Sequence, residues 1–273
     1  MNGLTLANGH WPPGRLPVVR VAATGDLHVR GPEDRRLVPG LGDLHTRADL
    51  LVITGDLTEN GRLVEAEAAV DMLAAARLPI VAILGNHDLR SLRRTAFRRT
   101  LERGGIEVLD GGATVVTAPD GARIGIAGTT GCGGGFWPLE GPDAIHARTF
   151  RRLALRASRE CATLERCLRD LDTDFRIAAV HFAPTVSTLG REPLLKYWML
   201  GNGDLGAVVD RTKPDVVFHG HAHLGTLKGR TPGGIPVRNV ALPVVGEVHL
   251  ETLHAKSLGA SGVFASRDQL AYG

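Results

Sequence analysis

Five short apolar runs, each followed at once by polar side chains, constrain the fold of this chain most strongly. The runs are VVRVAATGDLH (18–28), DLLVITGDL (49–57), PIVAILGNHD (79–88), RIAAVHFAP (176–184) and DVVFHGHAH (215–223). Continuous runs of Val, Ile, Leu and Ala of this length indicate strands that are buried on both faces. Helical segments alternate with these runs, which is typical of an α/β protein.

Three segments between the runs are expected to be helices. Residues 61–78 carry apolar side chains at helical spacing, 90–103 are very basic, and 148–171 place leucines on one stripe. Residues 113–119 and 122–130 are two β-like runs joined by Asp120-Gly121, a strong hairpin signal. Residues 235–248 are expected to add further strands. We therefore expect an α/β fold in which two β-sheets pack face to face, flanked by helices.

Composition indicates one globular domain. The chain has 273 residues, 43% hydrophobic and 22% charged, with no internal repeat and no sharp linker. We expect residues 1–273 to form a single domain with a core at about 18–250 and peripheral ends. The net charge of +3 is scattered along the chain, which argues against a nucleic-acid partner.

Localisation is also predicted from composition. The three cysteines form no CxxC pair, which suits a reduced compartment. No secretory signal is visible, and no apolar stretch approaches the roughly 20 residues that a membrane helix needs. We expect a soluble cytoplasmic protein with no membrane partner.

The polar residues that follow the five runs form a set of potential metal ligands. Functional groups of open α/β sheets gather at the carboxyl ends of strands. The candidates are Asp26, His28, Asp56, Asn86, His87, Asp88, His181, His221 and His223. Such a set of oxygen and nitrogen donors without a thiolate suits Mn²⁺, Fe or Zn²⁺. Each motif alone is a weak signal, whereas five successive strand ends in this order are a strong one.

The motifs D-x-H, G-D, G-N-H-D, H and G-H-x-H, in this order over residues 26–223, resemble those of the calcineurin-like metallophosphoesterase superfamily. The resemblance implies two face-to-face sheets flanked by helices, and two metal ions that share one carboxylate. The implied ligands are Asp56 as the bridge; Asp26, His28 and His223 for the first ion; and Asn86, His181 and His221 for the second.

The activity that the resemblance implies is hydrolysis of a small phosphorylated substrate by attack of a metal-bridging hydroxide. His87 would lie over the phosphate and protonate the leaving oxygen. Asp88 either accepts a hydrogen bond from the His87 ring or caps a helix that begins near Ser91. His219 precedes the last two histidine ligands at the same spacing of two, and we expect it to pack or to support a ligand rather than bind metal.

The substrate class is less constrained than the chemistry. Family protein phosphatases and dinucleotide polyphosphate hydrolases usually read G-D-x-x-D-R-G and G-N-H-E, whereas residues 55–61 read GDLTENG and the third motif ends in Asp88. This pattern is similar to that of the class III cyclic nucleotide phosphodiesterases, so a phosphodiester is favoured. The alternatives are a phosphomonoesterase or nucleotidase, a nuclease, a single-metal hydrolase and a non-catalytic scaffold.

The segment GTTGCGGGFWPLEGP (128–142) has no counterpart among these motifs. Its glycines and aromatic residues would either form a lip over the site or tuck the aromatic rings into the core.

Overall fold

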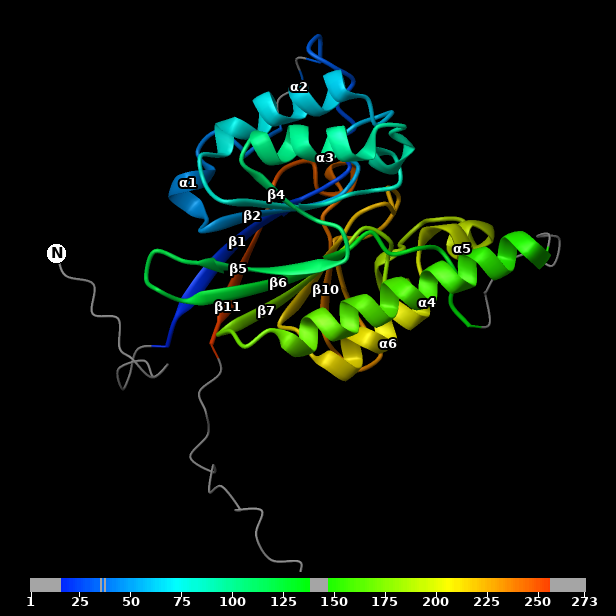
Figure 1. Cartoon of the computed structure of the whole chain (residues 1–273). Coiled ribbons are helices and arrows are strands. Elements are labelled where there is room, and N and C mark those ends of the chain that lie inside the picture. The colour runs from blue at the N-terminus through cyan, green and yellow to red at the C-terminus, as the bar shows by residue number, and fades with distance from the viewer. Residues whose placement is uncertain (1–15, 35, 37, 138–146, 256–273) are drawn as a thin grey trace, which may run out of the picture.

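The protein is described by a computed structural model that covers residues 16–34, 36, 38–137 and 147–255. Two β-sheets lie face to face, and helices cover the outer face of each sheet (Figure 1). The expected αββα sandwich is therefore confirmed. Among the described helices, none combines the length and apolar character that crossing a bilayer requires.

The first sheet contains five strands in the order β11-β1-β2-β3-β4. Their bounds are β1 (Val18–Thr24), β2 (Leu50–Thr54), β3 (Ile80–Ile83), β4 (Ile106–Leu109) and β11 (His249–His254). Strands β1 to β4 are parallel, and β11 pairs antiparallel with β1. Because β1, β2 and β3 are parallel neighbours, the polar residues that follow them emerge at one edge of the sheet.

The second sheet contains six strands in the order β5-β6-β7-β8-β10-β9. Their bounds are β5 (Gly112–Thr117), β6 (Arg123–Thr129), β7 (Phe175–Val180), β8 (Val216–His219), β9 (Lys228–Arg230) and β10 (Pro236–Asn239). Strands β5 and β6 form the expected hairpin, whose turn is closed by a bond of 2.9 Å from the Gly121 N–H to the Ala118 carbonyl. Strands β6, β7, β8 and β10 are parallel.

The helices connect the strands across the outer faces. Their bounds are α1 (Leu44–Arg47), α2 (Leu63–Leu73), α3 (Arg94–Arg103), α4 (Ala147–Asp170), α5 (Tyr197–Leu200), α6 (Gly203–Thr212) and α7 (Leu242–Val245). Short 3₁₀ turns are η1 (Ala74–Ala76), η2 (Asp88–Arg90), η3 (Val186–Thr188) and η4 (Leu194–Lys196).

Two expected element boundaries differ from the structure. The basic helix begins at Arg94 rather than near residue 90, because residues 88–90 form η2 and Ser91 leaves it with a ψ of 123°. Residues 235–248 contain one strand, β10, followed by α7. Pro243 has no N–H to donate to a sheet, whereas the first turn of a helix tolerates it.

Alternate residues of the central strands β2 and β3 enter different cores, which is why these two strands are apolar throughout apart from the terminal Thr54. Val21 and Ala23 of β1 pack against β6, β7 and β8 in the core between the sheets. Ala22, between them, faces the opposite way, into the core formed with α1, α2 and α3. The outer face of the second sheet packs on α4 and α6 through Leu164, Leu168 and similar residues.

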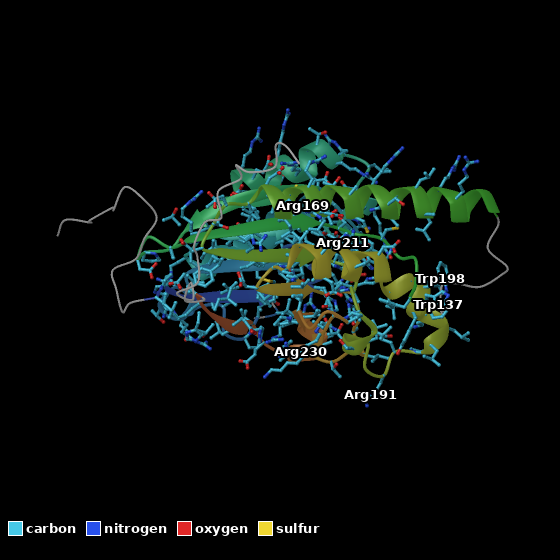
Figure 2. All side chains as sticks on the ribbon, turned by 90° about the horizontal axis from the view of Figure 1, so that it is seen from below. Trp137, Arg169, Arg191, Trp198, Arg211 and Arg230 are labelled. Carbon is cyan, nitrogen blue, oxygen red and sulfur yellow. The ribbon has the colours of Figure 1, made fainter. Side chains whose placement is uncertain are left out.

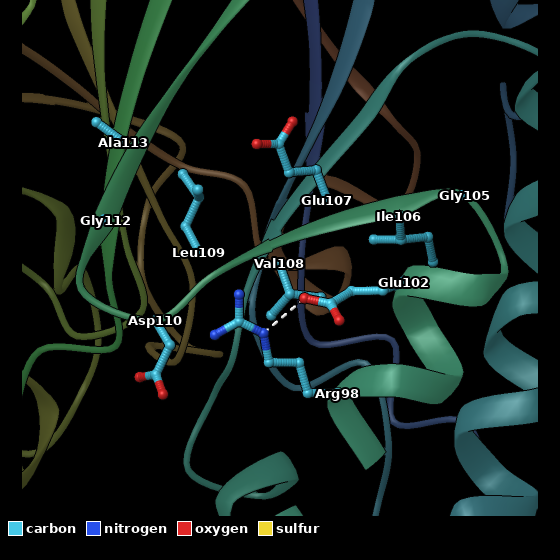
Figure 3. Close-up of a pocket in the computed structure, with 10 residues that line it drawn as sticks. All are labelled: Arg98, Glu102, Gly105, Ile106, Glu107, Val108, Leu109, Asp110, Gly112 and Ala113. Atoms are coloured by element: carbon cyan, nitrogen blue, oxygen red, sulfur yellow. Dashed lines mark hydrogen bonds and ion pairs between the residues drawn. The ribbon is translucent and has the colours of Figure 1, made fainter. Parts of the chain in front are cut away.

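A surface hollow of about 620 Å³ runs along the edge strand β4 (Figure 3). Arg98 and Glu102 of α3 form an ion pair of 2.6 Å in its wall, and Asp110 lies at one end. None of the candidate metal ligands lines this hollow.

Candidate metal centre

The loops that follow β1 and β2 are hydrogen-bonded to each other along their length. The N–H groups of Asp26, His28 and Val29 donate to the carbonyls of Gly55, Asp56 and Leu57 at 2.9, 3.0 and 2.9 Å. The residues after β3, β7 and β8 meet these loops from both sheets. The candidate ligands are therefore attached to backbone that is fixed by hydrogen bonds.

The backbone at the site is strained. Asp26, His28, Asp56 and His221 have φ values of 56°, 48°, 51° and 69°, in the left-handed region that L-residues avoid. Elsewhere in the described part of the chain, only Arg77 and Lys213 share this property among non-glycine residues, and both end helices. Such strain persists where surrounding structure enforces it, and it clusters at functional sites.

One group of three ligand-type side chains contains Asp26, His28 and His223, whose donor atoms lie within 4.8 Å of one another. His223 Nε2 is 2.9 Å from Asp26 Oδ1. Both ring nitrogens of His28 are buried without a hydrogen-bond partner in the described structure. Because an orphaned buried imidazole is unfavourable unless something binds it, this group fits a metal ion.

A second group contains Asp56, His181 and His221, also within 4.8 Å. His181 Nδ1 lies 2.8 Å from the Thr54 carbonyl oxygen and donates to it, so Nε2 is the ring nitrogen that faces the site. The side-chain oxygen of Asn86 is 2.9 Å from that Nε2. His221 Nε2 in turn donates to the Met199 carbonyl at 3.1 Å, which leaves its other ring nitrogen as a potential donor to a metal.

The Asp56 carboxylate faces both groups. Its Oδ2 atom is 3.8 Å from His28 Nε2 and 3.4 Å from His181 Nε2. Its Oδ1 atom accepts a hydrogen bond of 2.8 Å from the His87 N–H. A carboxylate between two sets of imidazoles is placed where a bridging ligand would have to be.

Charge compensation keeps the two carboxylates ionised. Burial acts to raise the pKa of Asp56, but the charge of His181 outweighs it and the pKa falls well below its usual range. Burial and the His223 hydrogen bond oppose each other in the same way at Asp26, and its pKa is also lowered. Burial lowers the pKa of His221 to about 4, so its ring is neutral. Ionised carboxylates and neutral imidazoles are the forms that bind metals.

The pKa values of two other histidines, His181 and His223, are raised instead. Burial acts to lower the pKa of His181, but the charge of Asp56 raises it to about 9. The hydrogen bond that the His223 ring donates to Asp26 raises the pKa of His223. In the metal-free protein, protons therefore supply the positive charge that a bound cation would replace.

Asp88 makes neither of the two contacts that were expected for it. Its carboxylate is buried and accepts hydrogen bonds from the N–H of Leu57, the N–H and hydroxyl of Thr58 and the N–H of Gly85, at 2.7–3.2 Å. Burial, assisted by the charge of Asp56, raises its pKa to about 6. Asp88 therefore ties the β2 loop to the β3 loop, and it neither bonds the His87 ring nor caps α3.

The partner of the His87 ring is Glu59, which the sequence analysis missed. His87 Nδ1 lies 2.6 Å from the Glu59 carbonyl oxygen and 3.6 Å from its carboxylate. His87 Nε2 lies 3.2 Å from the guanidinium of Arg90, also missed. Glu59 completes a third group of close donor atoms with His28 and His87. The only indication of Glu59 in the sequence was its position three residues after Asp56.

His219 lies outside these groups. It is fully buried, its Nδ1 is 2.8 Å from the Gly220 carbonyl and its Nε2 is 2.8 Å from the Thr188 hydroxyl. Both ring nitrogens are thus occupied by the protein, and burial lowers its pKa to about 4.

One of the two aromatic rings in the segment 128–142 is tucked into the core, as one of the two expected arrangements had it. Phe136 is buried against Tyr197, whereas Trp137 is 84% exposed. Residues 138–142 lie outside the described part of the chain.

Comparisons with known proteins agree with this architecture. A solved structure superposes with a TM-score of 0.58 at 14% identity, covering 87% of this chain and 95% of that one. The protein TT1561 of Thermus thermophilus gives 0.52 at 18% identity, covering 88% and 100%. A putative 5'-nucleotidase from Staphylococcus aureus gives 0.50 at 17% identity, covering 82% of this chain and 48% of that one. At these identities the similarity establishes the fold.

The sequence itself identifies the family. No match was found among curated proteins. The calcineurin-like phosphoesterase profile, however, matches residues 19–225, which include every candidate ligand. The chain therefore belongs to the calcineurin-like phosphoesterase family.

Proposed function

We propose that this protein is a dinuclear metal-dependent phosphoesterase acting on a small phosphorylated substrate. The position of the Asp56 carboxylate between two sets of imidazoles carries the proposal. Asp26, His28 and His223 would hold one ion, Asn86, His181 and His221 the other, with Asp56 shared. The donor set suits Mn, Fe or Zn. Bound ions would supply positive charge for the phosphate and lower the pKa of a water molecule.

The proposal assigns the remaining steps to side chains beside the ligands. His87 faces the same side of the site as His28, with ring centroids 4.6 Å apart. Once its Nε2 atom has taken up a proton from solvent, the ring would donate that proton to the leaving oxygen. The backbone carbonyl of Glu59 orients the His87 ring by accepting a hydrogen bond from Nδ1. Arg90, whose guanidinium lies beside His87 Nε2, would bind a phosphate oxygen and release the ring. Asp88 would hold the loops of Asp56 and Asn86 in register.

A phosphodiester is the favoured substrate class because the GDLTENG and GNHD motifs are similar to those of the phosphodiesterase branch. A phosphomonoester is the second candidate. Arg30 and Arg90 both lie near Glu59, at 3.6 and 3.4 Å, and two cations there would suit the additional negative charge of a monoester.

The test compares bis-p-nitrophenyl phosphate with p-nitrophenyl phosphate, using protein stripped with chelator and reloaded with Mn²⁺, Fe²⁺ or Zn²⁺. We expect metal-dependent hydrolysis with a higher kcat/KM for the diester, and a higher value for the monoester would establish the second candidate instead.

His87→Ala should keep its metal content and lose about 10²- to 10⁴-fold in kcat. Arg90→Gln should raise KM, because it removes the guanidinium proposed to bind a phosphate oxygen. Arg94→Gln is its matched control and should leave KM unchanged, because the Arg94 guanidinium bonds to the Leu89 carbonyl rather than to His87. Absence of hydrolysis with every metal would refute the proposal.

A further inference from the structure

Four large apolar side chains are exposed on α5, on η4 just before it, and on the loop that is hydrogen-bonded to the end of α5. Leu195 is 89% exposed, Trp137 84%, Leu194 62% and Met199 51%. We refer to these four residues as the apolar tip. Scattered apolar residues on a surface are ordinary, but a contiguous exposed group marks an interaction site.

The apolar tip is a fixed feature of the fold. The N–H groups of Gly134 and Gly135 donate to the carbonyls of Trp198 and Gly201, both at 2.9 Å. Phe136 packs edge-to-face on Tyr197, with ring centroids 6.4 Å apart. Trp137 and Trp198 consequently lie side by side at one end of the molecule (Figure 2). The exposed side chains therefore project from segments that are held by backbone bonds and a buried ring.

The same segment contacts the metal centre. The carbonyl of Met199 accepts the hydrogen bond from His221 Nε2 at 3.1 Å. The carbonyl of Leu200 accepts one from the Ala183 N–H at 3.0 Å, two residues after His181. A molecule bound by the apolar tip would therefore have its polar end beside the second group of ligands.

The exposed charges on residues 191–200, the segment that carries three residues of the apolar tip, are positive. Arg191 and Lys196 are exposed on the segment that carries Leu194 and Leu195. The one acid of residues 191–200, Glu192, is buried and accepts a hydrogen bond of 2.8 Å from the Leu224 N–H. Exposed Leu and Trp side chains beside Lys and Arg are the combination that binds anionic lipid surfaces.

We propose that the apolar tip inserts into an anionic phospholipid bilayer and thereby presents a lipid phosphoester to the metal centre. The second half of this statement rests on the proposed function. The contact is peripheral, so it requires no membrane-spanning helix, although it departs from the expectation that the protein has no membrane partner. The substrate class would then be phospholipids or lipid-linked phosphoesters.

The experiment is co-sedimentation of the full chain with vesicles of phosphatidylcholine alone or with 30% phosphatidylglycerol (about one anionic lipid in three). We expect binding to the anionic vesicles, and a loss of about tenfold or more in the double variant Trp137→Ser, Leu195→Ser. Lys196→Gln should lose about fivefold. Val64→Ser is the matched control, since Val64 is 44% exposed on α2, and should bind as the wild type does.

Several results would overturn the inference. These are equal binding to neutral and anionic vesicles, no binding to either, or equal losses in the double variant and in Val64→Ser. Circular dichroism establishes that the variants are folded.

Binding and catalysis are separated by a second pair of measurements. Vesicle binding should persist in chelator, and the double variant should hydrolyse soluble bis-p-nitrophenyl phosphate as fast as the wild type. Vesicle binding without hydrolysis of any substrate would refute the proposed function alone, whereas hydrolysis without vesicle binding would refute the apolar tip alone.

Discussion

The substitution Gly85→Ala tests the packing of the metal centre most finely. A methyl group at this position would overlap the Oδ1 and backbone N of Asp56, and its carbon would lie 2.7 Å from Asp56 Cγ. Carbon atoms in contact are separated by about 3.5–4.0 Å, so the carboxylate must move by about 0.8 Å or more. Metal–ligand distances tolerate about 0.2 Å. The variant should therefore lose the shared ligand although every ligand residue is still present.

The loss of metal binding in Gly85→Ala can be measured as a loss of metal-dependent stability. At a Mn²⁺ concentration 100 times its Kd, one bound ion stabilises the wild type by about 2.7 kcal/mol. For a domain of this size, this raises Tm by roughly 5–10 °C. In chelator, Gly85→Ala should be less stable by about 1–3 kcal/mol because of overpacking, and Mn²⁺ should restore little of this.

Thermal unfolding with and without Mn²⁺, followed by circular dichroism, is the assay. Gly112→Ala is the matched control, because a methyl group there meets nothing within 4 Å, and it should show the full wild-type shift. Asp56→Asn removes the carboxylate directly and should show no shift if Gly85→Ala does not fold. If Gly85→Ala and Asp56→Asn both show the same Mn²⁺-dependent rise in Tm as the wild type, the Asp56 carboxylate is not a metal ligand.

Three further substitutions separate the roles of neighbouring residues. His219→Gln should lower the free energy of unfolding by about 1–3 kcal/mol, because it disturbs buried hydrogen bonds. Its metal content by elemental analysis should equal that of the wild type, and a loss of metal would mean that His219 is a ligand. Glu59→Gln removes the carboxylate 3.6 Å from His87 Nδ1 but keeps the backbone carbonyl that bonds to this atom, so it should keep its metals and lower kcat by less than about tenfold. A loss of kcat as large as that of His87→Ala would mean that the carboxylate itself takes part in the proton transfer. Phe97→Ala leaves a cavity at a buried position on α3. It should lower the free energy of unfolding, measured by chemical denaturation, by about 3–5 kcal/mol and leave the metal content unaltered. A smaller loss of stability would indicate that α3 packs loosely on the first sheet.

The strands that carry the candidate ligands (β1, β2, β3, β7 and β8) were predictable from sequence, because parallel strands buried on both faces are largely apolar, whereas β4, β9 and β11 were not predicted. The runs around residues 21–23 and 216–218 therefore indicated β1 and β8 without ambiguity. The order of the motifs also indicated which side chains should meet. The structure brings Asp26, His28 and His223 together from positions that are nearly 200 residues apart in the chain.

The contacts made by each side chain were less predictable. The left-handed backbone at Asp26 and Asp56 depends on hydrogen bonds between two loops and has no local sequence signature. Asp88 follows His87 directly, yet it bonds to the β2 loop, because η2 turns its side chain away from the ring. Glu59 reaches His87 from another loop, and only the folded arrangement brings the two together.

Anomalous diffraction at the manganese absorption edge, on crystals of protein reloaded with Mn²⁺, measures the central claim directly. We expect two peaks, one on each side of the Asp56 carboxylate. A single peak, or peaks that Asp56 does not contact, would contradict it.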